Sequence, residues 1–126
     1  VTREVVVAPK APSAIGPYSV AVKAGGMVYV SGMIGLDPAT GRLVEGGVEA
    51  QTRQALANME AVLAAAGSGA GKVVKAVVLL RTMDDYAAVN VEYAKVFVKD
   101  PPARAAFAVA GLPANALVEI AVDATL

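Results

Sequence analysis

The sequence predicts an α+β fold in which two helices pack on one face of a mixed β-sheet. Short segments rich in Val and other β-branched residues predict strands. Two longer segments repeat apolar residues every three or four positions, as amphipathic helices do. These segments follow one another in the order β-ββ-α-β-α-ββ. The length of 126 residues predicts one domain that spans residues 1–126.

The segments before the first helix are predicted to form strands. Residues 3–7, REVVV, have the β-branched composition of a short strand. Residues 18–32 predict a hairpin, with strands of five or six residues on either side of Gly25 and Gly26. Residues 36–43 contain Asp-Pro and Gly and predict the loop that leads to the helix.

The first helix is expected from Val48 to about Ala66. Leu56, Met59 and Leu63 recur at helical spacing and predict its buried side. Gly67 follows as a residue type that commonly ends helices. The polar residues of this segment fall mostly outside the predicted buried side: Gln51, Arg53, Gln54, Asn58 and Glu60.

The second half of the chain predicts one more helix between strands. Residues 73–80, VVKAVVLL, have the near-continuous apolar character of a strand buried on both faces. Asp84 or Asp85 is expected to cap the second helix, and two strands follow at about 104–110 and 116–124. The predicted buried side of this helix has four members: Tyr86, Val89, Tyr93 and Phe97.

The composition predicts an oligomer and argues against a nucleic-acid partner. The chain has 11 basic and 11 acidic residues, whereas dedicated nucleic-acid binders are normally basic. Hydrophobic residues make up 56% and charged residues 17%, so apolar side chains exceed what a small core needs. The chain has no third helix for the other face of the sheet. We therefore expect identical subunits to cover that face.

The absence of two residue types excludes several kinds of chemistry. The chain has no cysteine and no histidine, which excludes a thiol nucleophile, a Ser-His-Asp triad and the usual zinc sites. No run of residues has the length and apolar character of a membrane span. The N-terminal residues carry charges where a secretory signal would be apolar. We expect a cytoplasmic protein with no membrane partner.

Two charged residues stand alone in apolar strands. Arg104 shares its predicted strand face with alanines only, and Glu119 shares its face with Leu117 and Ala121. One interpretation is a structural ion pair, or edge charges that discourage aggregation. The other is a ligand site, because a guanidinium binds a small carboxylate in two-pronged fashion. Burial would also raise the pKa of Glu119 toward neutrality, although a nearby Arg104 would lower it.

Four further residues are weaker candidates for a site. Tyr18 follows the rigid Gly-Pro pair, but a lone tyrosine is more often part of a core. Ser31 and Gly32 end a strand where a ligand could approach the backbone, although Gly often marks only a bulge. Asn90 interrupts the apolar side of the second helix, where most such residues are solvated or bonded to backbone.

The sequence resembles the RidA (YjgF) family of reactive-intermediate imine deaminases over nearly its whole length. The most specific part of the resemblance is PPARAAFAVAGLP at 101–113 together with ALVEI at 116–120. GPYS at 16–19 and SGMIG at 31–35 support it.

This resemblance implies a chorismate-mutase-like fold that forms a homotrimer with three clefts between subunits. It implies hydrolysis of 2-aminoacrylate and its tautomer 2-iminopropanoate to a 2-oxo acid and ammonia, without a cofactor or metal. By the same resemblance, Arg104 would hold the substrate carboxylate, and Glu119 would activate water or carry the proton. The residues that would line the cleft are Tyr18, Ser31, Gly32 and Asn90.

The chain departs from the family pattern at four positions. Ala106 stands where many relatives have cysteine, and Val20, Met33 and Ala121 stand where polar Gln or Glu is frequent. Ala106 would remove a possible oxidation or modification site, and the other three apolar residues would alter substrate preference or strengthen trimer packing. Two other functions stay open. One is a non-catalytic trimer that binds small carboxylates for regulation. The other is a ribonuclease or translation inhibitor, which the balanced charge and few aromatic residues do not favour.

Overall fold

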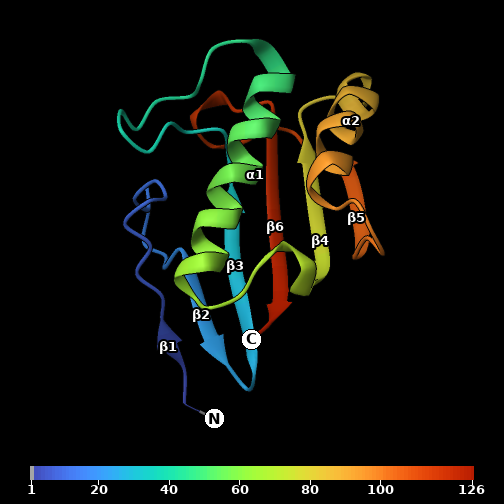
Figure 1. The fold of residues 1–126 in the computed structure, drawn as a ribbon. Coiled ribbons are helices and arrows are strands. Elements are labelled where there is room, and N and C mark those ends of the chain that lie inside the picture. Colours follow the sequence, from blue (N-terminus) through green and yellow to red (C-terminus); the bar gives the residue numbers. More distant parts are fainter. Residues whose placement is uncertain (1) are drawn as a thin grey trace.

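The computed structural model describes residues 2–126 and contains one six-stranded mixed sheet with two α-helices on one face (Figure 1). The strands lie in the order β1-β2-β3-β6-β4-β5, and all neighbours are antiparallel except β4 and β5. The strands are β1 (Glu4–Val5), β2 (Ala21–Ala24), β3 (Met27–Met33), β4 (Val73–Leu80), β5 (Ala103–Ala108) and β6 (Val118–Thr125). The helices are α1 (Gly47–Ala65) and α2 (Tyr86–Val96). The predicted α+β architecture is confirmed.

The core lies between the sheet and the two helices. Leu56, Met59 and Leu63 of α1 are buried, as their spacing predicts. In β6 every second residue points into this core, so Val118 and Ile120 are fully buried while Glu119 between them faces the other side of the sheet. α1 lies over β3 and β6, and α2 lies beside it toward β4 and β5 (Figure 1).

A buried carboxylate joins the two helices. Glu92 of α2 accepts hydrogen bonds from Lys95 Nζ at 2.9 Å and from Arg53 Nη1 of α1 at 3.2 Å. The hydrogen bond from Lys95 contributes most to lowering the pKa of Glu92 below its ordinary value. Glu92 is therefore held as an anion where α1 and α2 meet.

The first two strands are shorter than the sequence predicts. β1 has two residues and β2 begins only at Ala21, because residues 15–20 bend over the end of β3. The turn between β2 and β3 is confirmed, since Gly25 and Gly26 both have positive φ angles.

Three details of the second half differ from the predictions. β4 is buried on the helix-covered face only, because no element within residues 2–126 covers Lys75 on the other face. The Thr82 hydroxyl, and not the side chain of Asp84 or Asp85, caps the turn before α2 by accepting a hydrogen bond from Asp84 N. Tyr86 is partly exposed at the start of α2, whereas Val89, Tyr93 and Phe97 are buried as predicted.

Candidate functional site

A β-bulge in β3 brings Ser31 and Gly32 next to Glu119. β3 pairs with β6 at Val30 and again at Met33, and the register shifts between these two positions. Gly32 lies against the Glu119 side chain so closely that a Cβ atom at this position would overlap the carboxyl group. A side chain at position 32 would therefore force the Glu119 carboxyl group to move, because that group occupies the space of the Cβ atom.

Ser31 attaches the preceding loop to this bulge. Its backbone N–H donates to Val20 O at 2.9 Å, and its Oγ donates to Ser19 O at 2.6 Å. Tyr18, which precedes this segment, accepts a hydrogen bond from Ile15 N at 3.1 Å and is 44% exposed. Tyr18 is thus a surface residue at the mouth of the site and not part of the core.

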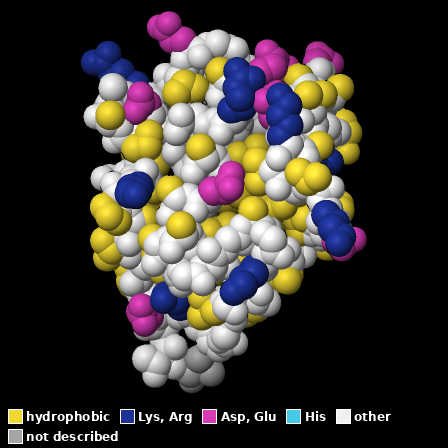
Figure 2. Space-filling model, viewed as in Figure 1, with side chains coloured by type: hydrophobic (Ala, Val, Ile, Leu, Met, Phe, Trp, Pro, Cys, Tyr) yellow, Lys and Arg dark blue, Asp and Glu magenta, His cyan; other side chains and the backbone are white. Residues whose placement is uncertain are grey.

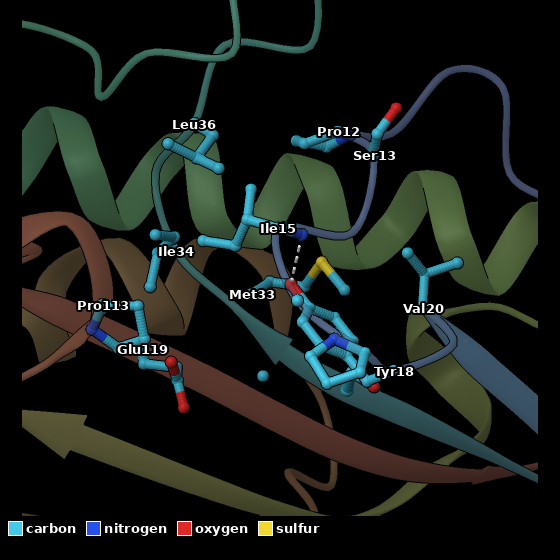
Figure 3. A pocket seen from close by; sticks show the side chains of 14 residues that line it. Pro12, Ser13, Ile15, Tyr18, Val20, Met33, Ile34, Leu36, Pro113 and Glu119 are labelled. Carbon is cyan, nitrogen blue, oxygen red and sulfur yellow. Dashed lines mark hydrogen bonds between the residues drawn. The ribbon is translucent and has the colours of Figure 1, made fainter.

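These residues surround a cavity of about 470 Å³, which we call the Glu119 pocket (Figure 3). It contains four of the six predicted site residues, namely Tyr18, Ser31, Gly32 and Glu119. In Figure 3, Glu119 lies at one end, Tyr18 lies toward the other, and Met33 and Ile15 lie between them. The remaining lining residues are mostly apolar: Pro12, Ser13, Ile15, Gly16, Pro17, Val20, Met33, Ile34, Leu36 and Pro113.

Glu119 is half-buried in this pocket. No cation of residues 2–126 forms a salt bridge with it. Burial raises the pKa of Glu119 above its ordinary value, because desolvation disfavours the charged carboxylate. The pocket therefore holds a carboxyl group suited to accepting and returning a proton closer to neutral pH than a free glutamate.

Arg104 lies on the opposite face of the sheet from Glu119. It pairs in register with Ala76 of β4, which in turn pairs with Val122 of β6. Ala76 and Val122 are both buried under the helices, so Arg104 shares the helix-covered face. A structural ion pair between Arg104 and Glu119, one of the two interpretations of the sequence, is not formed within the chain.

Arg104 lies against α2, in a group with Tyr86, Asn90 and Tyr93 that we call the Arg104 cluster. Arg104 Nη2 donates to the Tyr86 hydroxyl at 3.0 Å, and its Cζ lies 4.7 Å from the centroid of the Tyr93 ring. Asn90 belongs to the same face of α2, because residues 86, 90 and 93 are one and two turns apart. No carboxylate of residues 2–126 forms a salt bridge with Arg104.

Two buried polar atoms on this face of α2 lack hydrogen-bond partners among residues 2–126. They are Asn90 Oδ1 and the Tyr93 hydroxyl. Desolvation raises the pKa of Tyr93, and the positive charge of Arg104 opposes that shift. Buried polar atoms are normally paired. The Arg104 cluster therefore forms one part of a polar site, whose remaining hydrogen-bond partners do not come from residues 2–126.

Sequence reasoning missed two polar residues of α1 that support the pocket wall. Asn58 is 1% exposed, and its Nδ2 donates to Ile34 O at 3.1 Å and to Leu36 O at 2.9 Å. Gln51 is also buried, and its Oε1 accepts a hydrogen bond from Leu117 N, two residues before Glu119. We placed both residues outside the buried side of α1 because their amide groups are polar. The only sequence signal was that they fall on the same side of the helix as buried neighbours.

Two properties of the described residues concern other kinds of site. Within residues 2–126, no three Asp or Glu side chains gather closely enough to hold a metal ion. No helix in this range has the length and apolar character needed to cross a membrane.

Comparison with known proteins places this chain in a well-populated group. Residues 8–126 match the family described as Endoribonuclease L-PSP. The chain is 48% identical over 120 residues to the 2-iminobutanoate/2-iminopropanoate deaminase of Mus musculus. This match covers 95% of the chain and 89% of the relative. It is 48% identical over 126 residues to the chloroplastic Reactive Intermediate Deaminase A of Arabidopsis thaliana, covering 100% of this chain and 67% of the relative.

Solved structures share the whole fold. The crystal structure of RidA from an Antarctic Psychrobacter bacterium has a TM-score of 0.94 and 41% identity, covering 98% of this chain and 99% of that one. The crystal structure of Escherichia coli TdcF with bound serine has a TM-score of 0.93 and 34% identity, covering 98% of each chain.

The contact between Gly32 and Glu119 predicts how a methyl group added at position 32 would change the pKa of Glu119. In Gly32→Ala, the new Cβ would displace the Glu119 carboxyl group toward water, so we expect its pKa to fall back toward that of a free glutamate. Carboxyl ¹³C NMR titration measures this shift. Gly71→Ala is the control, because a Cβ there meets nothing within 4 Å. An unchanged Glu119 pKa in folded Gly32→Ala would contradict this account of the contact.

The hydrogen bonds of Asn58 predict a loss of stability. Asn58→Leu would remove the side-chain donor to Ile34 O and Leu36 O; Ile34 O keeps the hydrogen bond from Leu36 N, whereas Leu36 O loses its donor. We expect the free energy of unfolding to fall by about 1–3 kcal/mol, measured by urea denaturation. Glu60→Leu, at an exposed position of the same helix, is the matched control. Equal stability of Asn58→Leu and Glu60→Leu would show that these bonds contribute nothing.

Proposed function

The chain belongs to the RidA (YjgF) family of reactive-intermediate deaminases, and we propose that it hydrolyses 2-imino acids and their enamine tautomers to 2-oxo acids and ammonia. The substrates would include 2-aminoacrylate and 2-iminopropanoate, and the reaction would need no cofactor. The observation that carries this proposal is the half-buried Glu119, which has a raised pKa and lies beside a glycine bulge in an open cavity. The relatives named as 2-iminobutanoate/2-iminopropanoate deaminases support the reaction class.

The proposed site is assembled from two subunits. The Glu119 pocket and the Arg104 cluster lie on opposite faces of one sheet, so they cannot act on one small molecule within a chain. A head-to-tail contact between copies would place the Arg104 cluster of one subunit at the Glu119 pocket of the next. Heterologous contacts of this kind form a ring when the rotation between neighbouring copies closes. We propose a chorismate-mutase-like homotrimer with three such sites.

The uncovered face of the sheet supports this assembly. Tyr29 and Phe107 are each 48% exposed although both are large and apolar. Tyr29 pairs with Asp123 and Phe107 pairs with Leu79, which are both on the Glu119 side of the sheet. Neighbouring subunits would remove this apolar surface from water, which favours association.

In the proposed mechanism the Arg104 cluster and the Glu119 pocket have separate roles. The guanidinium of Arg104 would bind the substrate carboxylate by two parallel hydrogen bonds. Asn90 Oδ1, which has no partner among residues 2–126, would accept a hydrogen bond from the substrate nitrogen. Tyr18 and the bulge at Ser31 and Gly32 would hold the substrate against Glu119.

Glu119 would then act as the base and the acid in turn. Its carboxylate takes a proton from water as the water oxygen bonds to the imine carbon and the C=N π electrons move to nitrogen. The same carboxyl group returns that proton to nitrogen, which gives a carbinolamine. The carboxylate then takes the proton of the carbinolamine hydroxyl and passes it to the amino group, while the C–N bond breaks and the C=O bond forms, so that ammonia and the 2-oxo acid leave. A raised pKa suits both steps, because the group must gain and lose a proton near working pH. Fixed orientation of water and substrate would supply much of the acceleration.

Two other functions are distinguishable from hydrolysis. A trimer that only binds carboxylates would bind 2-oxo acids without producing them from imines. The family description names an endoribonuclease, but basic and acidic side chains are interspersed on the helix-covered face (Figure 2). RNA cleavage that persists in Arg104→Ala would favour that activity over the proposed one.

Mixing two inactive variants tests the site between subunits. We expect Arg104→Ala and Glu119→Gln each to lose most turnover of 2-iminopropanoate while the oligomer stays intact. When the two are refolded together in equal amounts, about a quarter of the sites would receive an intact Glu119 pocket and an intact Arg104 cluster. Activity should therefore return to about a quarter of the wild-type rate.

A second mixture is the matched control. Wild type refolded with the double variant Arg104→Ala/Glu119→Gln would also give about a quarter of the rate if each site spans two subunits, but about half if each site lies within one chain. In the within-chain case, the two single variants would restore nothing. That pair of results would reject the shared site, and 2-oxo acid formation is the measurement in every mixture.

The raised pKa of Glu119 predicts the acidic limit of activity. Lowering the pH protonates Glu119 and removes the base, so kcat/KM should fall on the acidic side with the pKa of Glu119, which burial raises and the Arg104 of a neighbouring subunit would lower. The rate of uncatalysed hydrolysis is subtracted at each pH. Glu119→Gln has no carboxyl group to titrate, so its residual activity should lack this limb. If the acidic fall in kcat/KM occurs at the same pH in Glu119→Gln, another group is responsible for it.

A further inference from the structure

A tyrosine hydroxyl holds the guanidinium of Arg104. Tyr86 is the first residue of α2, and its hydroxyl accepts a hydrogen bond from Arg104 Nη2 at 3.0 Å. The Cζ atom of Arg104 lies 5.6 Å from the centroid of the Tyr86 ring and 4.7 Å from that of the Tyr93 ring. The buried Tyr93 hydroxyl has no hydrogen-bond partner among residues 2–126. Tyr93 therefore gives the guanidinium an aromatic face, whereas Tyr86 supplies the directional bond.

The strand that carries Arg104 gives its side chain little support. β5 is an edge of the sheet, since it pairs only with β4. Ala106 and Ala108 follow Arg104 on the same face of β5 and have no side-chain atom beyond Cβ. An arginine side chain has several rotatable bonds, and a ligand that binds it must otherwise pay the loss of that freedom. The bond to Tyr86 restricts the guanidinium before a ligand arrives.

The hydroxyl of Tyr86 is a neutral acceptor, so it orients the guanidinium without compensating its charge. Arg53 shows the contrast, because it donates to the carboxylate of Glu92, which Lys95 also contacts. A carboxylate bonded to Arg104 in this way would compete with an anionic ligand. The guanidinium has more N–H donors than the bond to Tyr86 uses. One edge of it therefore keeps a parallel pair of donors for the two oxygens of a ligand carboxylate.

From this arrangement we propose that Tyr86 is a positioning residue, whose hydroxyl orients the Arg104 guanidinium for the substrate carboxylate before the substrate binds. The inference rests on the proposed function, in which Arg104 binds that carboxylate. Tyr86 acts through Arg104 and not on the reacting atoms. The carboxylate keeps its charge throughout hydrolysis, so Arg104 binds it equally in the ground state and the transition state. Loss of the Tyr86 hydroxyl should therefore raise KM and leave kcat unchanged.

The test measures the binding of two stable ligands and the turnover of 2-iminopropanoate. Pyruvate is the 2-oxo acid that this imine yields, and pyruvamide has nearly the same shape without the charge. In Tyr86→Phe we expect the Kd for pyruvate, from titration calorimetry, to rise about tenfold, as for a lost hydrogen bond to a charged group. The Kd for pyruvamide should not change, and KM for the imine should rise at constant kcat. Val91→Ala, at an exposed position of α2, should keep all wild-type values.

A double-mutant cycle tests whether Tyr86 acts through Arg104. Arg104→Lys keeps a positive charge but lacks the planar guanidinium, so it should itself bind pyruvate more weakly than wild type. When Tyr86→Phe is added to Arg104→Lys, we expect a further change in Kd of less than about twofold, because the bond to the guanidinium is already absent. An equal tenfold loss in both backgrounds would contradict a role through Arg104.

The outcomes separate this inference from the proposed function. An unchanged Kd for pyruvate in Tyr86→Phe, together with weaker binding by Arg104→Lys, would overturn the inference and leave the proposed function intact. Equal weakening of pyruvate and pyruvamide would also overturn it, because the whole site would then have changed. Wild-type pyruvate binding and turnover in Arg104→Lys would instead reject the role of Arg104 in the proposed function. Tyr86 is 37% exposed and phenylalanine keeps its ring, so Tyr86→Phe is expected to fold.

Discussion

The contact between Gly32 and the Glu119 carboxyl group is the constraint on which the rest of the site depends. It exists because β3 carries one extra residue where it pairs with β6, which shifts the register between Val30 and Met33. The bulge turns Ser31 toward the loop that carries Tyr18, while the missing side chain at Gly32 leaves room for the carboxyl group. One irregularity in an otherwise regular sheet thus creates the cavity, positions its acid and anchors its outer loop.

Arg104 and Glu119, the two charged residues that stand alone in apolar strands, lie in separate environments. Alternation along β6 puts Glu119 on the uncovered face, while the register through β4 puts Arg104 under α2. Arg104 forms contacts with Tyr86 and Tyr93 but with no carboxylate of residues 2–126. A guanidinium without a carboxylate and a carboxyl group without a cation, on two faces of one chain, are complementary surfaces for two copies.

The sequence predicted the architecture well because its signals were local. The hairpin at Gly25-Gly26, the helix that ends before Gly67 and the alternation around Glu119 follow from φ preference and side-chain period, and all three are confirmed. Predictions that needed long-range packing were less accurate. Gln51 and Asn58 are buried because the backbone of residues 34–36 and 117 offers them hydrogen bonds, which no pattern within α1 reveals. The relative placement of Arg104 and Glu119 depends on strand order, which the sequence did not supply.

Under the proposed arrangement, the separation of acid and cation makes chemistry a property of the assembly. The core, the bulge and the half-buried glutamate all form from one chain, yet no cation of residues 2–126 forms a salt bridge with that glutamate, so the group that binds an anionic metabolite would come from a neighbour. Each chain would also serve two neighbouring centres, giving an acid to one and a cation to the other. Loss of both Arg104 and Glu119 from a single polypeptide would therefore inactivate two centres of a ring. The protein concentration below which the ring dissociates would set the lower concentration limit for activity.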